Sequence, residues 1–121
     1  MKEIVAIIRP NKVNATKDAL EKLGAPSLTA LSVLGRGRQK GIAEELKIEV
    51  RPSNLHVNKV AMKFIPKRML FIVVPDSQVD LVIETLIKTN QTGQIGDGKI
   101  FVCPVDDVMR IRTEETGDNA L

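Results

Sequence analysis

The sequence predicts an α+β domain in which one antiparallel sheet of four strands carries two helices on one face. Two segments of the 121-residue chain repeat the same order at a fixed offset: an apolar strand, a proline, a helix, a glycine-containing break and a second strand. Each segment is therefore a βαβ unit. Two such units side by side form a ferredoxin-like sandwich, and we expect residues 1–121 to be one domain.

The first strands and the helices of the two repeats have clear patterns. Residues 4–8 and 69–74 are apolar runs rich in Ile and Val, typical of strands buried on at least one face. Pro10 and Pro75 end these strands and can open the helices that follow, since a first helical turn leaves its N–H groups unpaired anyway. Apolar residues at helical spacing then mark each helix. They are Val13, Leu20 and Leu23 in the first helix, and Val79, Val82, Ile83, Leu86 and Ile87 in the second.

The remaining elements follow the helices. A break at residues 24–26 leads to the strand "LTALSVLG", and a break at residues 93–98 leads to "KIFVCPV". Residues 108–113 read as a short additional strand, on which Arg110 and Arg112 would point the same way. Residues 114–121 read as a mobile acidic tail. The face of the sheet without helices is apolar, so we expect it to meet other subunits.

A long segment between the repeats fits neither of them. Residues 36–58 have no sustained apolar period, mix charges, and contain Gly37, Gly41 and Pro52. Loops of this length in a small domain are usually functional or disordered. We favour a functional loop, because its first residues form a glycine-rich basic cluster.

Composition excludes several classes of protein. The chain has no Trp or Tyr and three Phe, whereas proteins that bind single-stranded nucleic acid stack the bases on aromatic side chains. We therefore expect no nucleic-acid partner. No apolar run is long enough for a signal peptide or a membrane span, so we expect a cytoplasmic protein without stable membrane association. Cys103 is the only cysteine and His56 the only histidine, so no catalytic set with histidine can be assembled. We expect no enzyme.

Two clusters of glycine and basic residues predict a phosphate site. Gly93, Gly98 and Lys99 have the spacing G-x-x-x-x-G-K of a P-loop, but the next residue is not Ser or Thr, and a strand follows instead of a helix. Glycine backbone and a lysine still suit phosphate oxygens, and the alternative for these residues alone is a glycine turn with a solvated lysine. The second cluster, "GRGRQKG" at residues 35–41, follows a strand and offers arginine forks for phosphate and the Gln39 amide oxygen for a hard metal ion.

These residues resemble a known family. The cluster "GRGRQKG", the segment "IPKRMLFIVVPD" and the run "TGQIGDGKIFVCPVDDVMRIRT" are similar to the PII nitrogen-regulatory signal proteins. The family signature T-x-x-x-G-D-G-K-I-F-V is met at every position of residues 92–102. The resemblance implies a trimer with ATP or ADP in the clefts between subunits, 2-oxoglutarate bound beside the nucleotide through Mg²⁺, and a long "T-loop" that contacts the regulated target.

The resemblance also implies the roles of individual residues. Gln39 would bind Mg²⁺, and Gln39, Lys40, Gly41 and Lys67 would bind 2-oxoglutarate. The remaining positions would bind the nucleotide. They are Thr29, near the base, with Gly35, Gly37, Arg38, Gly96, Asp97, Gly98, Lys99, Arg110 and Arg112.

Three departures narrow the resemblance. The tyrosine that many PII proteins carry in the T-loop is missing, so uridylylation is excluded. Phe71 stands where many members of the family have Glu. The loop at residues 36–58 is also longer than in ordinary members. An elongated loop without tyrosine resembles the subgroup encoded with nitrogenase in methanogenic archaea. The resemblance then implies a homotrimer, or a hetero-oligomer with a PII paralogue, that binds dinitrogenase and inhibits it reversibly.

Three other functions remain open at this stage. The first is a PII-type regulator of an ammonium transporter or of another nitrogen-assimilation enzyme. A transporter regulator would insert a T-loop side chain into the pore, for which Arg51 is the candidate. A nucleotide-hydrolysing enzyme would need a base near the γ-phosphate, and none can be named. A ferredoxin-like amino-acid-binding module would not need two glycine-rich basic clusters.

Overall fold

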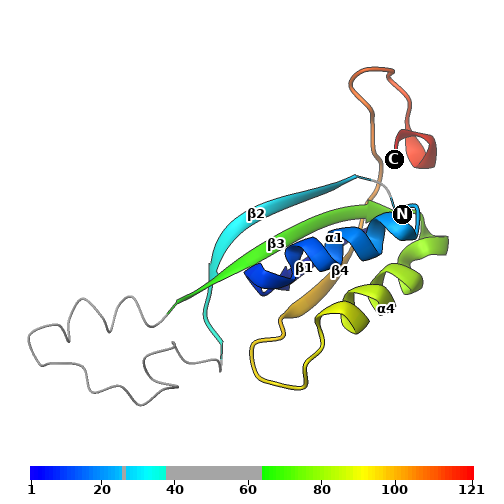
Figure 1. Ribbon diagram of the computed structural model, residues 1–121. Coiled ribbons are helices and arrows are strands. Elements are labelled where there is room, and N and C mark those ends of the chain that lie inside the picture. The colour runs from blue at the N-terminus through cyan, green and yellow to red at the C-terminus, as the bar shows by residue number, and fades with distance from the viewer. Residues whose placement is uncertain (26, 38–63) are drawn as a thin grey trace, which may run out of the picture.

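The structure, a computed structural model, describes residues 1–25, 27–37 and 64–121. In this part of the chain four strands form one sheet in the order β2–β3–β1–β4, and every neighbouring pair is antiparallel. The strands are β1 (Lys2–Ile8), β2 (Leu28–Gly35), β3 (Ile65–Val74) and β4 (Lys99–Pro104). Helices α1 (Val13–Lys22) and α4 (Val79–Asn90) lie side by side along one face of the sheet (Figure 1). The predicted ferredoxin-like sandwich is confirmed.

The face of the sheet under the helices forms the core. Every second residue of β1 is buried there, as expected for a strand with one covered face. Ile4 pairs with Ile72 of β3, so apolar side chains of neighbouring strands stack on the same face. The helices contribute one apolar stripe each. The buried core consists of Ile4, Ala6, Ile8, Leu20, Leu70, Ile72, Val74, Val82 and Leu86.

The opposite face of the sheet is apolar and open in this single chain. Val5 is paired with Phe71 on one side and with Phe101 on the other, which places all three side chains on this face. Phe71 is 39% exposed and Phe101 48%, and Leu31 of β2 shares the face with 48% exposed. Such a surface is unusual for a protein that stays monomeric.

A polar pair joins the two helices inside the core. The Thr16 hydroxyl donates to the Lys12 carbonyl oxygen at 2.7 Å and accepts a hydrogen bond from Asn90 Nδ2 at 3.0 Å. Asn90 Nδ2 also donates to the Leu86 carbonyl oxygen at 2.9 Å. Thr16 is fully buried and Asn90 is 5% exposed. This pair therefore fixes how α1 and α4 sit on each other.

The boundaries of three elements differ from the sequence-based expectation. Each proline is followed by a short 3-10 helix before the α-helix starts: η1 (Pro10–Lys12) and η3 (Asp76–Gln78). Strand β3 begins at Ile65, four residues before the apolar run that predicted it, because its register with β2 continues to the pair Gly35 and Ile65. The predicted loop at residues 36–58 falls, beyond Gly37, outside the described residues.

The C-terminal residues depart most from expectation. The predicted strand at residues 108–113 is wrong: only an isolated bridge between Met109 and Thr116 forms, because the chain reverses in a turn where Glu114 has a φ of 59°. Arg110 is drawn into this turn, since its guanidinium donates to the Glu115 carboxylate and to the Asn119 and Leu121 carbonyl oxygens, each at 3.1 Å. Residues 114–121, expected to be a mobile tail, thus fold back and include the 3-10 helix η4 (Gly117–Ala120).

None of the described helices has the length and apolar character needed to cross a lipid bilayer.

We predict that Thr16→Val lowers the free energy of unfolding by about 1–3 kcal/mol, because it removes the acceptor of a buried amide without changing side-chain volume. Urea denaturation measures this loss. The matched control is Thr85→Val on α4. Thr85 makes the same bond to the carbonyl four residues earlier, at 2.8 Å, but is partly exposed. Its replacement should change stability by at most about 0.5 kcal/mol; equal losses would contradict a role for the interhelical bond.

Candidate functional site

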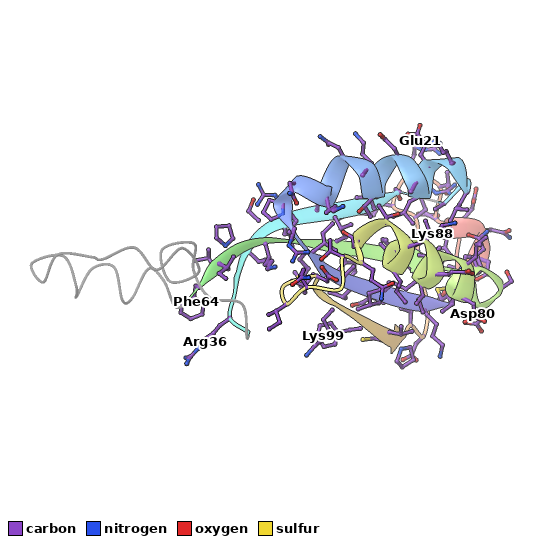
Figure 2. The ribbon with its side chains drawn as sticks, turned by 60° about the horizontal axis from the view of Figure 1, so that its bottom comes forward. Glu21, Arg36, Phe64, Asp80, Lys88 and Lys99 are labelled. Atoms are coloured by element: carbon purple, nitrogen blue, oxygen red, sulfur yellow. The ribbon has the colours of Figure 1, made fainter. Side chains whose placement is uncertain are left out.

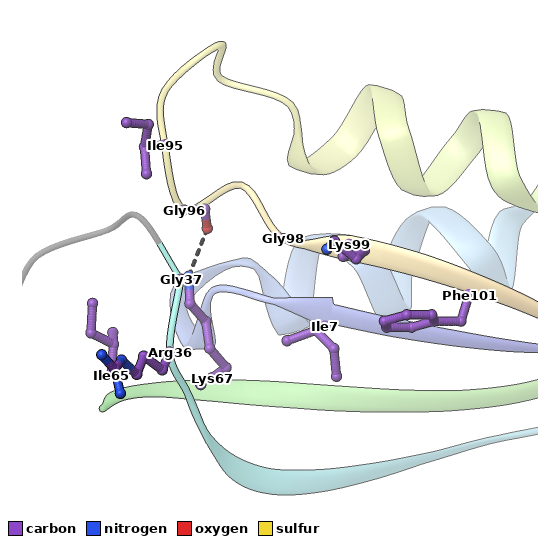
Figure 3. A pocket seen from close by; sticks show the side chains of 11 residues that line it. Ile7, Arg36, Gly37, Ile65, Lys67, Ile95, Gly96, Gly98, Lys99 and Phe101 are labelled. Carbon is purple, nitrogen blue, oxygen red and sulfur yellow. Dashed lines mark hydrogen bonds between the residues drawn. The ribbon is translucent and has the colours of Figure 1, made fainter. Parts of the chain in front are cut away.

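Three segments that are distant in sequence meet at one end of the sheet. These are the end of β2 at Gly35, the start of β3 at Ile65, and the loop at residues 91–98 that joins α4 to β4 (Figure 3). Together they enclose a cleft of about 540 Å³. Its lining residues are Ile7, Gly35, Arg36, Gly37, Ile65, Lys67, Ile95, Gly96, Gly98, Lys99 and Phe101. Residues 35–37, the described part of one glycine-rich basic cluster, thus line the same cleft as Gly96, Gly98 and Lys99 of the other.

The loop at residues 91–98 depends on its glycines. Gly93, Gly96 and Gly98 all have positive φ angles, of 82°, 103° and 112°. A Cβ on Gly98 would overlap the backbone carbonyl oxygen of Ile7 in β1. Only glycine permits this close approach, which seats the loop against the central strand.

Lys67 forms one wall of the cleft. It is 7% exposed, its stem lies against Gly35, and its ammonium donates to the Gly96 carbonyl oxygen at 2.6 Å (Figure 3). Burial and the positive charge of Arg9 lower the pKa of Lys67, while the Asp97 carboxylate acts in the opposite direction. The ammonium therefore links β3 to the loop at the point where Gly96 enters the cleft.

Asp97 holds the loop together from within. Its carboxylate accepts hydrogen bonds from the Thr92 hydroxyl, from the Thr92 and Gly93 backbone N–H groups at 2.8 and 2.9 Å, and from the Arg9 guanidinium. The bonds from Thr92 and Arg9 hold the pKa of Asp97 well below its usual range. Asp97 was predicted as a nucleotide contact, but in this structure both of its oxygens bind the chain itself.

Arg9 is the residue of this site that the sequence analysis missed. The signal was weak, since it is a single basic residue between an apolar strand and a proline. Its partner Asp97 lies 88 positions away. Neither spacing nor composition relates the two residues, and only the pairing of β1 with β4 brings them together.

Three predicted nucleotide contacts lie away from the cleft. Thr29 precedes Gly35 by six positions in β2, which corresponds to about 20 Å along an extended strand. It lines a separate pocket of about 210 Å³ with Phe71, its partner in β3. Arg110 is engaged by the C-terminal turn, and Arg112 is exposed in that turn. Within one chain, some of the predicted nucleotide contacts therefore line the cleft, whereas Thr29, Arg110 and Arg112 lie away from it.

The proposed metal and effector residues of the basic cluster are not part of the described structure. Arg38, Gln39, Lys40 and Gly41 fall outside the described residues. Among the residues that are described, no group of three or more His, Cys, Asp or Glu side chains is arranged to hold a metal ion.

The cleft is suited to an anion. Arg36, Lys67 and Lys99 bring positive charge, and the glycines that line it let a ligand approach the backbone closely. Figure 2 shows Arg36 and Lys99 on the same side of the molecule. Of the described residues that line it, none is a carboxylate, a histidine or a hydroxyl residue that could act as a base or nucleophile.

Comparison with known proteins finds relatives along the length of the chain. The family model described as "Nitrogen regulatory protein P-II" matches residues 1–115. A "Nitrogen fixation nifHD region GlnB-like protein 2" of Methanobacterium ivanovii is 54% identical over 121 residues, which span 100% of this chain and 99% of that protein. A "Nitrogen fixation nifHD1 region GlnB-like protein 2" of Methanosarcina barkeri is 55% identical, with 100% and 99% covered. "Nitrogen regulatory protein P-II 1" of Escherichia coli is 44% identical over the full length of both chains.

We predict that Gly98→Ala lowers the free energy of unfolding by about 2–4 kcal/mol, from the strained φ and the overlap with the Ile7 carbonyl oxygen. The matched control is Gly93→Ala in the same loop. Gly93 also has a positive φ, but a methyl group there would meet no heavy atom within 4 Å beyond the adjacent residues, so about 1 kcal/mol should be lost. Urea denaturation compares the two. Equal losses would show that the contact between Gly98 and β1 does not constrain the loop.

Proposed function

Because the chain belongs to the nitrogen regulatory P-II family, we propose that it is a signal protein that senses ATP or ADP together with 2-oxoglutarate and reversibly inhibits nitrogenase by binding dinitrogenase. The observation that carries the proposal is the cleft in which residues 35–37 of one glycine-rich basic cluster meet residues 96–99 of the other. The names of the relatives from Methanobacterium ivanovii and Methanosarcina barkeri refer to nitrogen fixation, which supports nitrogenase as the target.

In this proposal the cleft binds the phosphate groups of the nucleotide. Lys99, at the start of β4, would contact phosphate oxygens, and Arg38 of the cluster at residues 35–41 would do the same. The glycine backbone at residues 35–37 and 96–98 lets the phosphates approach closely. Asp97 acts indirectly, because it holds the loop in shape through Thr92 and Arg9.

The base of the nucleotide would be bound by a second copy of the chain. Thr29, Arg110 and Arg112 lie apart from the cleft within one chain, so one nucleotide cannot contact all the predicted residues of a single subunit. A subunit packed on the open apolar face, which carries Phe71 and Phe101, would bring its own Thr29 to the cleft of its neighbour. This supports a trimer, or a hetero-oligomer with a PII paralogue, with sites between subunits.

The effector would bind beside the phosphates. Gln39 would hold Mg²⁺, and Lys67 would bind a carboxylate of 2-oxoglutarate with help from Lys40 and Gly41. The position of Lys67 supports this role, because its ammonium reaches the Gly96 carbonyl inside the same cleft. If both ligands share one metal ion, each must raise the affinity for the other by the same factor.

The loop at residues 36–58 would carry the signal to dinitrogenase. It contains charged residues and apolar anchors that suit a docking surface: Glu44, Glu45, Lys47 and Arg51, with Ile42, Leu46, Ile48 and Leu55. Gln39 is at the root of this loop, so Mg²⁺ and 2-oxoglutarate would fix the root in one geometry and release the target.

Lys99→Ala should weaken ATP binding by about 10- to 150-fold, since charge-assisted bonds to phosphate are worth about 1.5–3 kcal/mol. Isothermal titration calorimetry measures the change. Lys88→Ala, at an exposed lysine of α4, is the control for loss of one positive charge and should leave ATP affinity unaltered. An unchanged affinity in Lys99→Ala would remove Lys99 from the site.

Replacing residues 42–58 by a Gly-Ser linker should abolish binding and inhibition of nitrogenase while ATP binding persists, because loop closure depends weakly on loop length. Nitrogenase activity is assayed with and without a PII paralogue, and ATP binding by the replaced protein serves as the control for folding. The wild-type complex should dissociate when Mg-ATP and 2-oxoglutarate are added. Normal inhibition by the replaced protein would refute the loop as effector surface. Retention of wild-type protein by an ammonium transporter instead would identify another target.

A further inference from the structure

Arg9 joins the end of the central strand to the loop that enters the cleft. It follows β1 directly, and its guanidinium reaches two atoms of the loop at residues 91–98. Nη1 donates to Asp97 Oδ1 at 2.5 Å, and Nη2 donates to the Ile95 carbonyl oxygen at 3.1 Å. The side chains of Arg9 and Asp97 are only 19% and 23% exposed. This ion pair is therefore partly shielded from water.

We propose that Arg9 is a positioning residue of the phosphate site, which holds residues 95–97 so that the Gly98 backbone and Lys99 face the nucleotide phosphates. The inference rests on the proposed function, since the phosphate ligand comes from it. Arg9 itself does not line the cleft and acts through Asp97 and Ile95.

The geometry of the guanidinium explains why the residue is arginine. Two donors of one planar group bind a carboxylate oxygen and a backbone carbonyl two residues away. The base of the side chain is also well fixed. Ile8, immediately before it, pairs with Arg68 of β3, and Pro10 after it restricts the backbone. A rigid anchor thus restrains a glycine-rich loop that has little stiffness of its own.

Arg9 also compensates the negative charge of Asp97. Asp97 places a carboxylate next to a cleft that is proposed to receive several negative charges. Arg9 neutralises that carboxylate at hydrogen-bond distance, while the Thr92 and Gly93 donors occupy its other lone pairs. Without Arg9, the carboxylate would repel phosphate, so its loss should affect affinity as well as loop order.

Arg9 also complements Lys67. Lys67 binds the Gly96 carbonyl, and Arg9 binds the residues on either side of it, Ile95 and Asp97. The loop would therefore stay attached to the sheet when the Lys67 ammonium turns to an effector carboxylate. Arg9 thus lets one cation of the site change partner without release of the phosphate loop.

The experiment compares Arg9→Ala, Arg9→Lys and the control Lys17→Ala, an exposed lysine of α1. Hydrogen exchange of residues 92–99, measured without nucleotide, should be at least about tenfold faster in Arg9→Ala, because the loop then opens more readily. Arg9→Lys keeps the charge but lacks the planar guanidinium whose two nitrogens reach Asp97 and Ile95, so its exchange rate should be intermediate. Lys17→Ala should match the wild type.

A second measurement, of ATP affinity, tests whether the ordering of residues 92–99 by Arg9 contributes to phosphate binding. Arg9→Ala should weaken ATP binding by about tenfold in the wild-type background and much less in Lys99→Ala, because a residue that positions Lys99 loses its effect once Lys99 is removed. An equal loss in both backgrounds would overturn the positioning role, as would unchanged ATP affinity or unchanged exchange. If the wild-type protein bound no ATP, the proposed function and the phosphate role would both fail, while the exchange data would still show whether Arg9 holds the loop.

Discussion

The pairing of β1 with both β3 and β4 is the constraint on which the candidate site depends. Ile7 lies in register between Met69 of β3 and Lys99 of β4, so the central strand determines where β4 begins. The loop before β4 can reach this position only because Gly98 carries no side chain against the Ile7 carbonyl. One backbone contact near the end of β1 thus places Lys99 beside the end of β2 and the start of β3.

Charge balance in the loop follows from the same placement. A glycine-rich loop that presents its backbone to a ligand loses much conformational entropy when it is ordered. Asp97 offsets this cost by accepting bonds from Thr92, Gly93 and Arg9, but a carboxylate alone would oppose an anionic ligand. The Arg9 guanidinium resolves the conflict, because it leaves the carboxylate available for the loop while cancelling its charge. An acidic residue within the proposed phosphate-binding loop is therefore physically consistent.

The sequence predicted the elements that depend on local chemistry and missed those that depend on distant contacts. Apolar periods and the breaks at Pro10 and Pro75 marked the strands and helices, and glycine spacing located the two clusters of the cleft. The C-terminal strand was wrong because Arg110 binds Glu115 and the chain reverses there, a contact that a strand-like alternation cannot reveal. The role of Arg9 was equally hidden, since its partner is set by strand pairing.

The predicted nucleotide contacts of one chain lie at two places, and this separation affects how the proposed trimer would bind a nucleotide. The cleft holds the groups that suit phosphates, whereas Thr29 lies with Phe71 in a pocket about 20 Å along the strand. A nucleotide bound between subunits would need both, so its affinity would depend on contact between the open sheet faces. In the proposed trimer, nucleotide binding and subunit association would then stabilise each other, because each supplies surface that the other requires. A change at the apolar face, far from any phosphate, would accordingly weaken nucleotide binding through assembly rather than through the cleft itself.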